Sequence, residues 1–155
     1  AHTAHSTGKW YFEVQGTFHP DNYDNGRVGL DHPSNDIDSA VGQGTNSYAI
    51  QSNGYRQSNG VFNPTQMTPP LPGANVIQIA WDADAGLLWY GVNGTWAFGG
   101  NPAAGTGASV TGVTGPLLPS SNMVSGDFAG NYTLSTTPAQ CAYTPPTGFG
   151  RWYRY

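Results

Sequence analysis

Carboxylate pairs are the side chains of this sequence that could break a glycosidic bond. Such hydrolysis needs two carboxyl groups about 5–10 Å apart, one of them with a raised pKa. Glu13 is the one glutamate, and no acidic residue stands two positions from it. The pairs Asp82/Asp84 and Asp36/Asp38 lie in turn-like segments, where aspartate bonds its own backbone. These residues predict turn capping rather than catalysis, so we expect a protein that is not an enzyme.

Nucleophilic catalysis has equally little support. It needs a base beside the nucleophile, and the four histidines are scattered: His2, His5, His19 and His32. The sequence has no Gly-x-Ser-x-Gly elbow. Cys141 is the one cysteine, which excludes an internal disulfide and a cysteine-based metal site. We expect it to be a small, buried residue.

Calcium is the metal that the sequence would favour if it bound one. Asp31, Asp36 and Asp38, together with Asn35, form an oxygen-rich segment, and calcium prefers six to eight oxygen ligands. The spacing fits no EF-hand, and turn carboxylates in contact with water explain it more simply. We therefore predict no bound metal and no cofactor, with these three aspartates as a weak calcium candidate.

Aromatic and amide side chains suggest binding instead. The segment from residue 46 to residue 60 places tyrosine, arginine and amide side chains between turn signals. Tyrosine and arginine anchor many interfaces, and amides supply paired hydrogen bonds. Two aromatic residues that follow the Asn93-Gly94 turn could form an exposed platform, although core packing is the more common fate of tryptophan. The candidate ligand-binding residues are Tyr48, Asn53, Tyr55, Arg56, Gln57, Trp96 and Phe98.

Composition limits the scaffold that positions these residues. The chain has 155 residues, which predicts one domain over 1–155, and its charged fraction is only 9%. Five Lys and Arg residues against nine Asp and Glu cannot form the basic stripe that nucleic acid requires. The apolar runs are too short to span a membrane. Many glycines and prolines beside 13% aromatic residues predict an all-β protein.

Alternating patterns locate the main strands. Residues 9–15 alternate, with Trp10, Phe12 and Val14 on one face. Residues 75–82 and 86–92 form a predicted hairpin around a turn at residues 82–86. We assign Trp10, Trp81 and Trp89 to the core or to a sheet surface. Shorter strands are predicted at residues 27–31, 47–51, 116–119 and 131–135.

Turn and loop signals separate these strands. Asn-Gly pairs at residues 25–26, 53–54, 59–60 and 93–94 predict tight turns. The small-residue segment 98–115 is expected to be a long surface loop, and the proline-containing segment 144–148 cannot sit in a central strand. No helical periodicity of a dozen residues occurs. Short strands with frequent turns predict an all-β sandwich or barrel.

Several of these segments resemble SPRY domains in the correct order. They are residues 6–14 (STGKWYFEV), 27–30 (RVGL), 75–82 (NVIQIAWD), 88–94 (LWYGVNG) and 143–149 (YTPPTGF). The last resembles the closing segment of SPRY-like domains in bacteriophage and bacterial proteins. The similarity spans about residues 6–149 and leaves residues 150–155 as an aromatic and basic tail that could pack on a sheet edge or against another subunit.

The resemblance implies a concanavalin A-like, two-sheet antiparallel β-sandwich. It also implies binding through loops at one edge and no catalytic activity. Together with sparse lysine, it favours an extracellular or virion-surface protein, such as a tail-fibre, spike or capsid-decoration domain. We expect it to contact a host glycan or protein through edge loops. The alternatives are a polysaccharide-active enzyme of the same architecture and a virion assembly protein that contacts other subunits alone.

Overall fold

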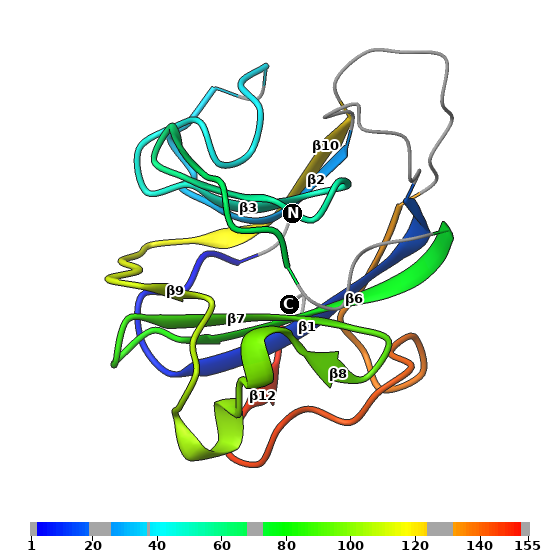
Figure 1. Ribbon diagram of the computed structural model, residues 1–155. Coiled ribbons are helices and arrows are strands. Elements are labelled where there is room, and N and C mark those ends of the chain that lie inside the picture. Colours follow the sequence, from blue (N-terminus) through cyan, green and yellow to red (C-terminus); the bar gives the residue numbers. More distant parts are fainter. Residues whose placement is uncertain (1–2, 19–25, 37, 68–72, 124–131, 153–155) are drawn as a thin grey trace.

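Two sheets stacked face to face make up the protein (Figure 1). The structure is a computed structural model that describes residues 3–18, 26–36, 38–67, 73–123 and 132–152. One sheet has the strand order β11-β1-β6-β7-β8, with β12 also paired to β1 and β9 to β7. The second sheet has the order β10-β2-β3-β4-β5. All pairs are antiparallel except β1 with β12, so the predicted sandwich is confirmed.

The strands are short, and two single-turn 3-10 helices are the helical elements among the described residues. The bounds are β1 Lys9–Phe18, β2 Gly26–Asp31, β3 Tyr48–Gln51, β4 Arg56–Ser58, β5 Val61–Asn63, β6 Gly73–Asp82, β7 Leu87–Val92, β8 Thr95–Trp96, η1 Ala97–Gly99, η2 Pro102–Ala104, β9 Val110–Thr111, β10 Leu118–Met123, β11 Thr133–Ser135 and β12 Gly150–Arg151. Within the described ranges, no helix is long and apolar enough to cross a membrane.

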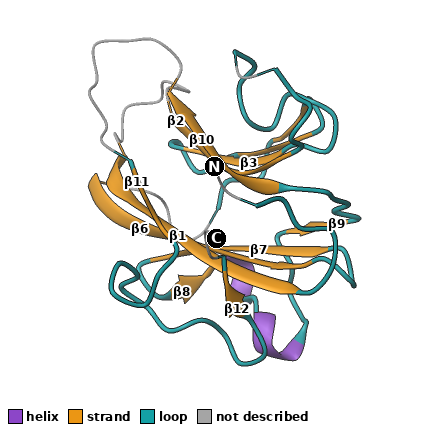
Figure 2. Cartoon of the chain, turned by 180° about the vertical axis from the view of Figure 1, so that it is seen from behind, coloured by secondary structure: helices purple, strands orange, loops and turns teal. Residues whose placement is uncertain are grey.

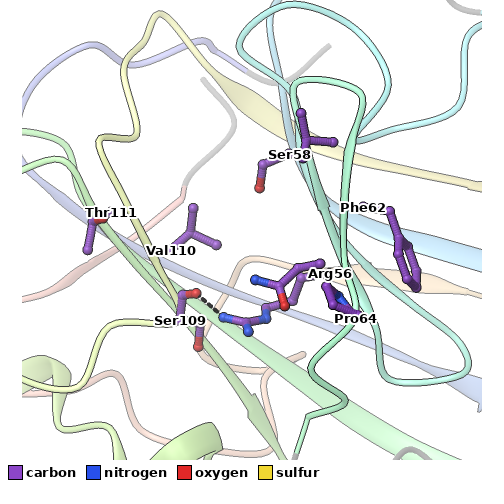
Figure 3. Close-up of a pocket in the computed structure, with 9 residues that line it drawn as sticks. Arg56, Ser58, Phe62, Pro64, Ser109, Val110 and Thr111 are labelled. Atoms are coloured by element: carbon purple, nitrogen blue, oxygen red, sulfur yellow. Dashed lines mark hydrogen bonds between the residues drawn. The ribbon is translucent and has the colours of Figure 1, made fainter.

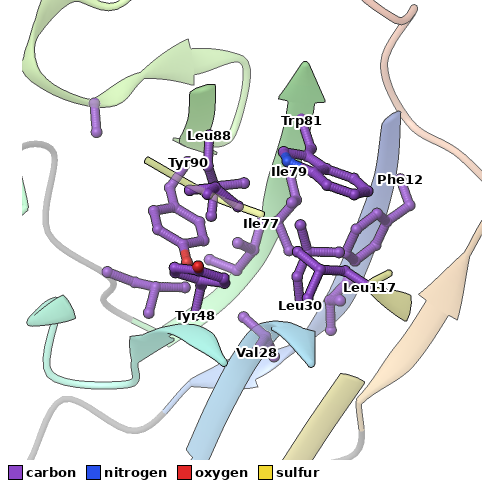
Figure 4. Close-up of a cluster of buried hydrophobic side chains, with 14 of the residues drawn as sticks. Phe12, Val28, Leu30, Tyr48, Ile77, Ile79, Trp81, Leu88, Tyr90 and Leu117 are labelled. Atoms are coloured by element: carbon purple, nitrogen blue, oxygen red, sulfur yellow. The ribbon is translucent and has the colours of Figure 1, made fainter. Parts of the chain in front are cut away.

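The core fills the space between the two sheets (Figure 4). Phe12 and Val14 point inward from β1, as the alternation predicted, and Trp10 is partly buried beside them. Figure 4 shows side chains of β2 and β3 facing those of β1, β6 and β7. Among the fully buried residues are Phe12, Val28, Leu30, Ile50, Ile77, Ile79, Trp81, Leu88 and Tyr90.

A second apolar cluster lies on the opposite face of the larger sheet. Tyr11, Ala80 and Trp89 are fully buried there, against Phe149 of the segment that precedes β12. Figure 2 shows from behind that loops and the two 3-10 helices cover this side of the sheet. Because both of its faces are covered, β1 contains almost no exposed position in its first half.

The Asn-Gly turns fit their predicted roles at three of four positions. Both residues of Asn59-Gly60 and of Asn93-Gly94 have positive φ, as tight hairpin turns require. Gly54 also has positive φ. Asn25 lies outside the described residues, and Gly26 belongs to β2, where a Cβ atom would stand 2.0 Å from the Tyr132 hydroxyl oxygen. Gly26 therefore has a packing role, and the turn predicted with Asn25 lies partly outside the described residues.

The segment 98–115, expected to be a surface loop, is corrected, because it contains η2 and β9, which pairs with β7. Of the two placements left open for the tail, the described residues 150–152 take the one on the sheet: β12 pairs with β1, and the Trp152 ring is fully buried against Trp81. The core therefore continues to residue 152. The strand predicted at 116–119 is β10 at 118–123. Of the strand predicted at 131–135, residue 131 lies outside the described residues, and residues 133–135 form β11.

Candidate functional site

A pocket of about 380 Å³ opens between the free edges of the two sheets. β4 and β5 form one wall of the pocket. Their cross-strand pairs, Arg56 with Asn63 and Ser58 with Val61, lie on the inner face of the smaller sheet, the same face from which β3 packs into the core. β9 and the residue before it form the other wall. The lining residues on that side are Ser109, Val110 and Thr111. Figure 3 shows Arg56 pointing across the pocket toward Ser109.

Arg56 is the charged group of this pocket. Its Nη1 donates a hydrogen bond to the Ser109 carbonyl oxygen, and its guanidinium carbon lies 4.5 Å from the centre of the Phe98 ring. The Nε–H is buried without a hydrogen-bond partner, and no described carboxylate contacts the side chain. Burial lowers the pKa of Arg56, although an arginine stays protonated at neutral pH. The pocket therefore holds a positive charge that nothing described neutralises.

Exposed apolar side chains gather around the same edge. Val61, Phe62 and Phe98 are the exposed large hydrophobic residues of the described chain, with exposed fractions of 70%, 50% and 39%. Val61 and Phe62 lie on β5, and Phe98 lies under Arg56. The Phe62 ring packs 5.2 Å from that of Tyr55 and stands on the other side of β5 from Val110 in Figure 3. Such a concentration around one pocket is typical of a contact surface.

Three of the predicted binding residues lie at this edge. Tyr55 is half-buried against Phe62, while Arg56 and Phe98 contact each other. Asn53 lies in the preceding turn, where its Oδ1 accepts a hydrogen bond from the backbone N–H of Tyr55. The structure brings these residues together from segments far apart in the sequence.

The other three candidates are corrected. Tyr48 is only 2% exposed and belongs to the core, because β3 alternates and Tyr48 points inward with Ile50. Gln57 points to the opposite face, where its side-chain oxygen accepts hydrogen bonds from Arg27 and Gln51 beneath the loop that contains Val41. Trp96 is half-buried against Tyr11 on the outer face of the larger sheet. None of the three lines the pocket.

Sequence reasoning missed the wall residues Val61, Asn63, Ser109 and Val110. β5 has three residues and β9 has two, which is too short for alternation to be visible. The Asn59-Gly60 turn was a usable signal, because the Val-Phe pair that follows such a turn is typical of a returning strand. No local pattern indicated that residues 109–111 would face β4.

The acidic residues have structural roles. Glu13 is fully buried, and its carboxylate accepts hydrogen bonds from the Tyr11 hydroxyl and from the backbone N–H groups of Ala142 and Tyr143. Asp82 accepts a hydrogen bond from the Ala85 N–H and pairs with the Lys9 ammonium at 2.9 Å. These contacts match the predicted turn capping at Asp82.

The aspartates of the weak calcium candidate do not come together as a metal site in the described part of the chain. Asp31 Oδ1 accepts hydrogen bonds from the backbone of His32 and the side chain of Asn35, and Asp36 accepts one from the backbone of Asp38. Across the described ranges, no group of three or more acidic, histidine or cysteine side chains is placed to hold a metal ion. The carboxylates of Asp31 and Asp36 thus bond to the segment that follows β2.

Cys141 is half-buried and packs against the second apolar cluster. Its thiol donates a hydrogen bond to the Ser135 carbonyl oxygen, 3.3 Å away. Burial raises the pKa of this thiol, and the neighbouring charge of Glu13 raises it further. A raised pKa suppresses the reactive thiolate, which agrees with the structural role predicted for this cysteine.

A comparison with solved structures places the fold. The chain resembles the SPRY domain of human HERC1 with a TM-score of 0.62 and 16% sequence identity, over 87% of this chain and 77% of that one. At this identity the likeness concerns the fold alone, and the chain has a SPRY-type β-sandwich. No protein-family model and no curated protein matches the sequence.

Proposed function

We propose that this protein is a non-catalytic binding module that contacts a protein ligand through the β4–β5 edge and the Arg56 pocket. The observation that supports the proposal most directly is the gathering of Val61, Phe62 and Phe98 around one charged pocket. Monomeric proteins seldom expose apolar groups together without a partner to cover them. Interfaces combine such apolar residues with aromatic and arginine anchors, and this edge offers Tyr55 and Arg56.

The setting is part of the proposal. Sparse lysine, net charge −4 and the residues 143–149, which resemble the end of bacteriophage-type SPRY-like domains, favour display on a virion or cell surface. In that setting many copies would act together, so that a weak single contact gives strong adhesion. A protein ligand is favoured over a glycan because aliphatic and aromatic groups dominate the exposed edge.

The test uses a multimer of the protein, presented to candidate host cells and to arrays of proteins and glycans. Binding to a protein that is lost in the double variant V61S/F62S supports the proposal. Ala103→Ser is the matched control, because Ala103 is exposed on η2 and does not line the pocket. Binding that survives in the double variant, or binding to glycans alone, would overturn the proposal.

Two alternatives have their own measurements. A polysaccharide-active enzyme would turn over β-glucans and lose that turnover in Glu13→Gln or Asp82→Asn. Against it, Glu13 is fully buried and Asp82 is 5% exposed, so neither carboxylate is placed to meet a polymer. A protein that contacts only other subunits would form oligomers by itself, and the mass in solution tests this alternative.

A further inference from the structure

We propose that the Arg56 pocket binds the side-chain carboxylate of an aspartate or glutamate in the protein ligand. This inference rests on the proposed function and adds the chemical group that is recognised. Its starting point is the guanidinium, which lines the pocket and has no acidic partner among the described residues. Arg56 is half-buried and its Nε–H is enclosed without a hydrogen-bond partner, so the pocket around this unpaired charge favours an anionic ligand.

Arg56 has hydrogen-bond donors that its described contacts do not use. A guanidinium has five N–H groups, and the described hydrogen bond to the Ser109 carbonyl uses one of them. The ring of Phe98 packs against the guanidinium, with 4.5 Å between the guanidinium carbon and the ring centre. Arg56 is therefore held in place before a ligand arrives, which reduces the entropy lost on binding. A carboxylate matches the planar, forked geometry of the remaining donors.

The pocket charge favours a monoanion. Arg56 is the one cation among the lining residues, so a phosphate with nearly two charges would be left partly uncompensated. Two of the polar wall atoms already accept hydrogen bonds within the protein: Asn63 Oδ1 from the Thr65 N–H, and Ser109 Oγ from the Tyr90 N–H. The lining therefore offers sugar hydroxyls fewer acceptors than its residue types suggest. Val61 and Val110 complete apolar walls suited to the methylene groups of an acidic side chain.

The direct test follows the arginine Nε–H signals by NMR while a capped glutamate, acetyl-glutamate N-methylamide, is added. The Arg56 signal is assigned from its absence in Arg56→Gln. A saturable shift of this signal supports the proposal when capped glutamine binds at least about tenfold more weakly, as expected for loss of a charge-assisted hydrogen bond. The absence of a saturable shift up to the solubility limit would overturn it, and so would equal binding of glucuronic acid or inorganic phosphate.

Asn63→Asp supplies a second test in a variant that keeps the local structure. Asn63 is the cross-strand partner of Arg56, and an aspartate there retains the acceptor for the Thr65 N–H. The new carboxylate lies beside the guanidinium, because directly paired residues have Cβ atoms about 5 Å apart. Capped glutamate should then bind at least about tenfold more weakly than to the wild type. Unchanged binding would contradict the proposal.

Arg151→Gln is the charge control for both tests. Arg151 is half-buried on β12 in the other sheet, so this variant removes one positive charge without altering the pocket. Its affinity for capped glutamate should equal that of the wild type. If V61S/F62S abolishes binding of the protein ligand while Arg56→Gln and Asn63→Asp leave it intact, the proposed function stands and the carboxylate inference is wrong.

Discussion

The carboxylate of Glu13 accepts a hydrogen bond from the backbone N–H of Tyr143, 2.8 Å away and 130 residues further along the chain. A second backbone donor, the Ala142 N–H, and the Tyr11 hydroxyl complete the set. These hydrogen bonds hold the segment around Ala142 and Tyr143 against the outer face of β1. Thus the one glutamate holds two parts of the sandwich together.

Replacing Glu13 by alanine should destabilise the protein by about 3 kcal/mol or more, because three donors in a buried environment lose their acceptor. Unfolding in urea measures the effect. Thr133→Ala, at an exposed position of β11 in the same sheet, is the control and should change the stability by less than about 1 kcal/mol. A loss below that value for Glu13→Ala would show that the hydrogen bonds at Glu13 contribute little.

Gly29→Ala should cost about 3 kcal/mol, because the added Cβ atom would stand 1.9 Å from the Tyr48 carbonyl oxygen in β3. The glycine of the 27–30 motif is thus explained by close strand packing. Gly150→Ala is the matched control, since its Cβ would meet nothing nearer than 3.7 Å. Denaturant midpoints of the two variants should differ clearly, and equal midpoints would contradict this explanation.

Trp152→Ala should destabilise the protein by about 3–5 kcal/mol, the usual cost of deleting a large buried aromatic side chain. The ring is fully buried and contacts the rings of Phe12 and Trp81. Calorimetry of the variant measures the change. If residues beyond 149 were merely an appended tail, the midpoint would not move.

The stability should fall in acid partly because of His5. Its ring stacks on Trp10 at 3.6 Å, and burial lowers its pKa below the ordinary value of about 6.5. The unfolded chain then binds more protons than the folded protein, so stability from this group is present above pH about 6.5 and is lost as the pH falls through the folded pKa. His5→Phe keeps the stacking and removes the titration.

Urea unfolding of the wild type and His5→Phe between pH 5 and 8 measures this contribution. The difference in unfolding free energy between the two proteins should change with pH in favour of the variant at the acid end. Parallel pH profiles would show that His5 has the same pKa in both states. Comparing the two proteins cancels the contributions of the groups that both share.

How well the sequence predicted the fold depended on strand length. β1, β6 and β7 were predicted as strands, and the inward face of β1 was predicted correctly at Phe12 and Val14. β4, β5 and β9 have two or three residues each, so neither their presence nor their facing could be read from a period of two. Tyr48 was misassigned for the same reason, since a strand of four residues gives little evidence of which face is buried.

The candidate site was predicted in part. Tyr55, Arg56 and Phe98 were selected by residue type, and the structure places them at one edge. Residue type could not show that these residues surround one pocket. The pocket forms because β9 of the larger sheet lies opposite β4 of the smaller sheet. Such a contact depends on the packing of the two sheets, which leaves no local signal in the sequence.

The indole N–H of Trp152 donates a hydrogen bond to the carbonyl oxygen of Thr3, 2.8 Å away. The first and the last described segments of the sandwich therefore lie side by side. A domain whose two end segments lie close together can be inserted into a loop of a host protein, since the two insertion points in the host need to be only a short distance apart. The same closeness favours circular permutation. A short linker would join the two end segments, and new termini would be placed at an uncrowded turn such as the one at Gly105.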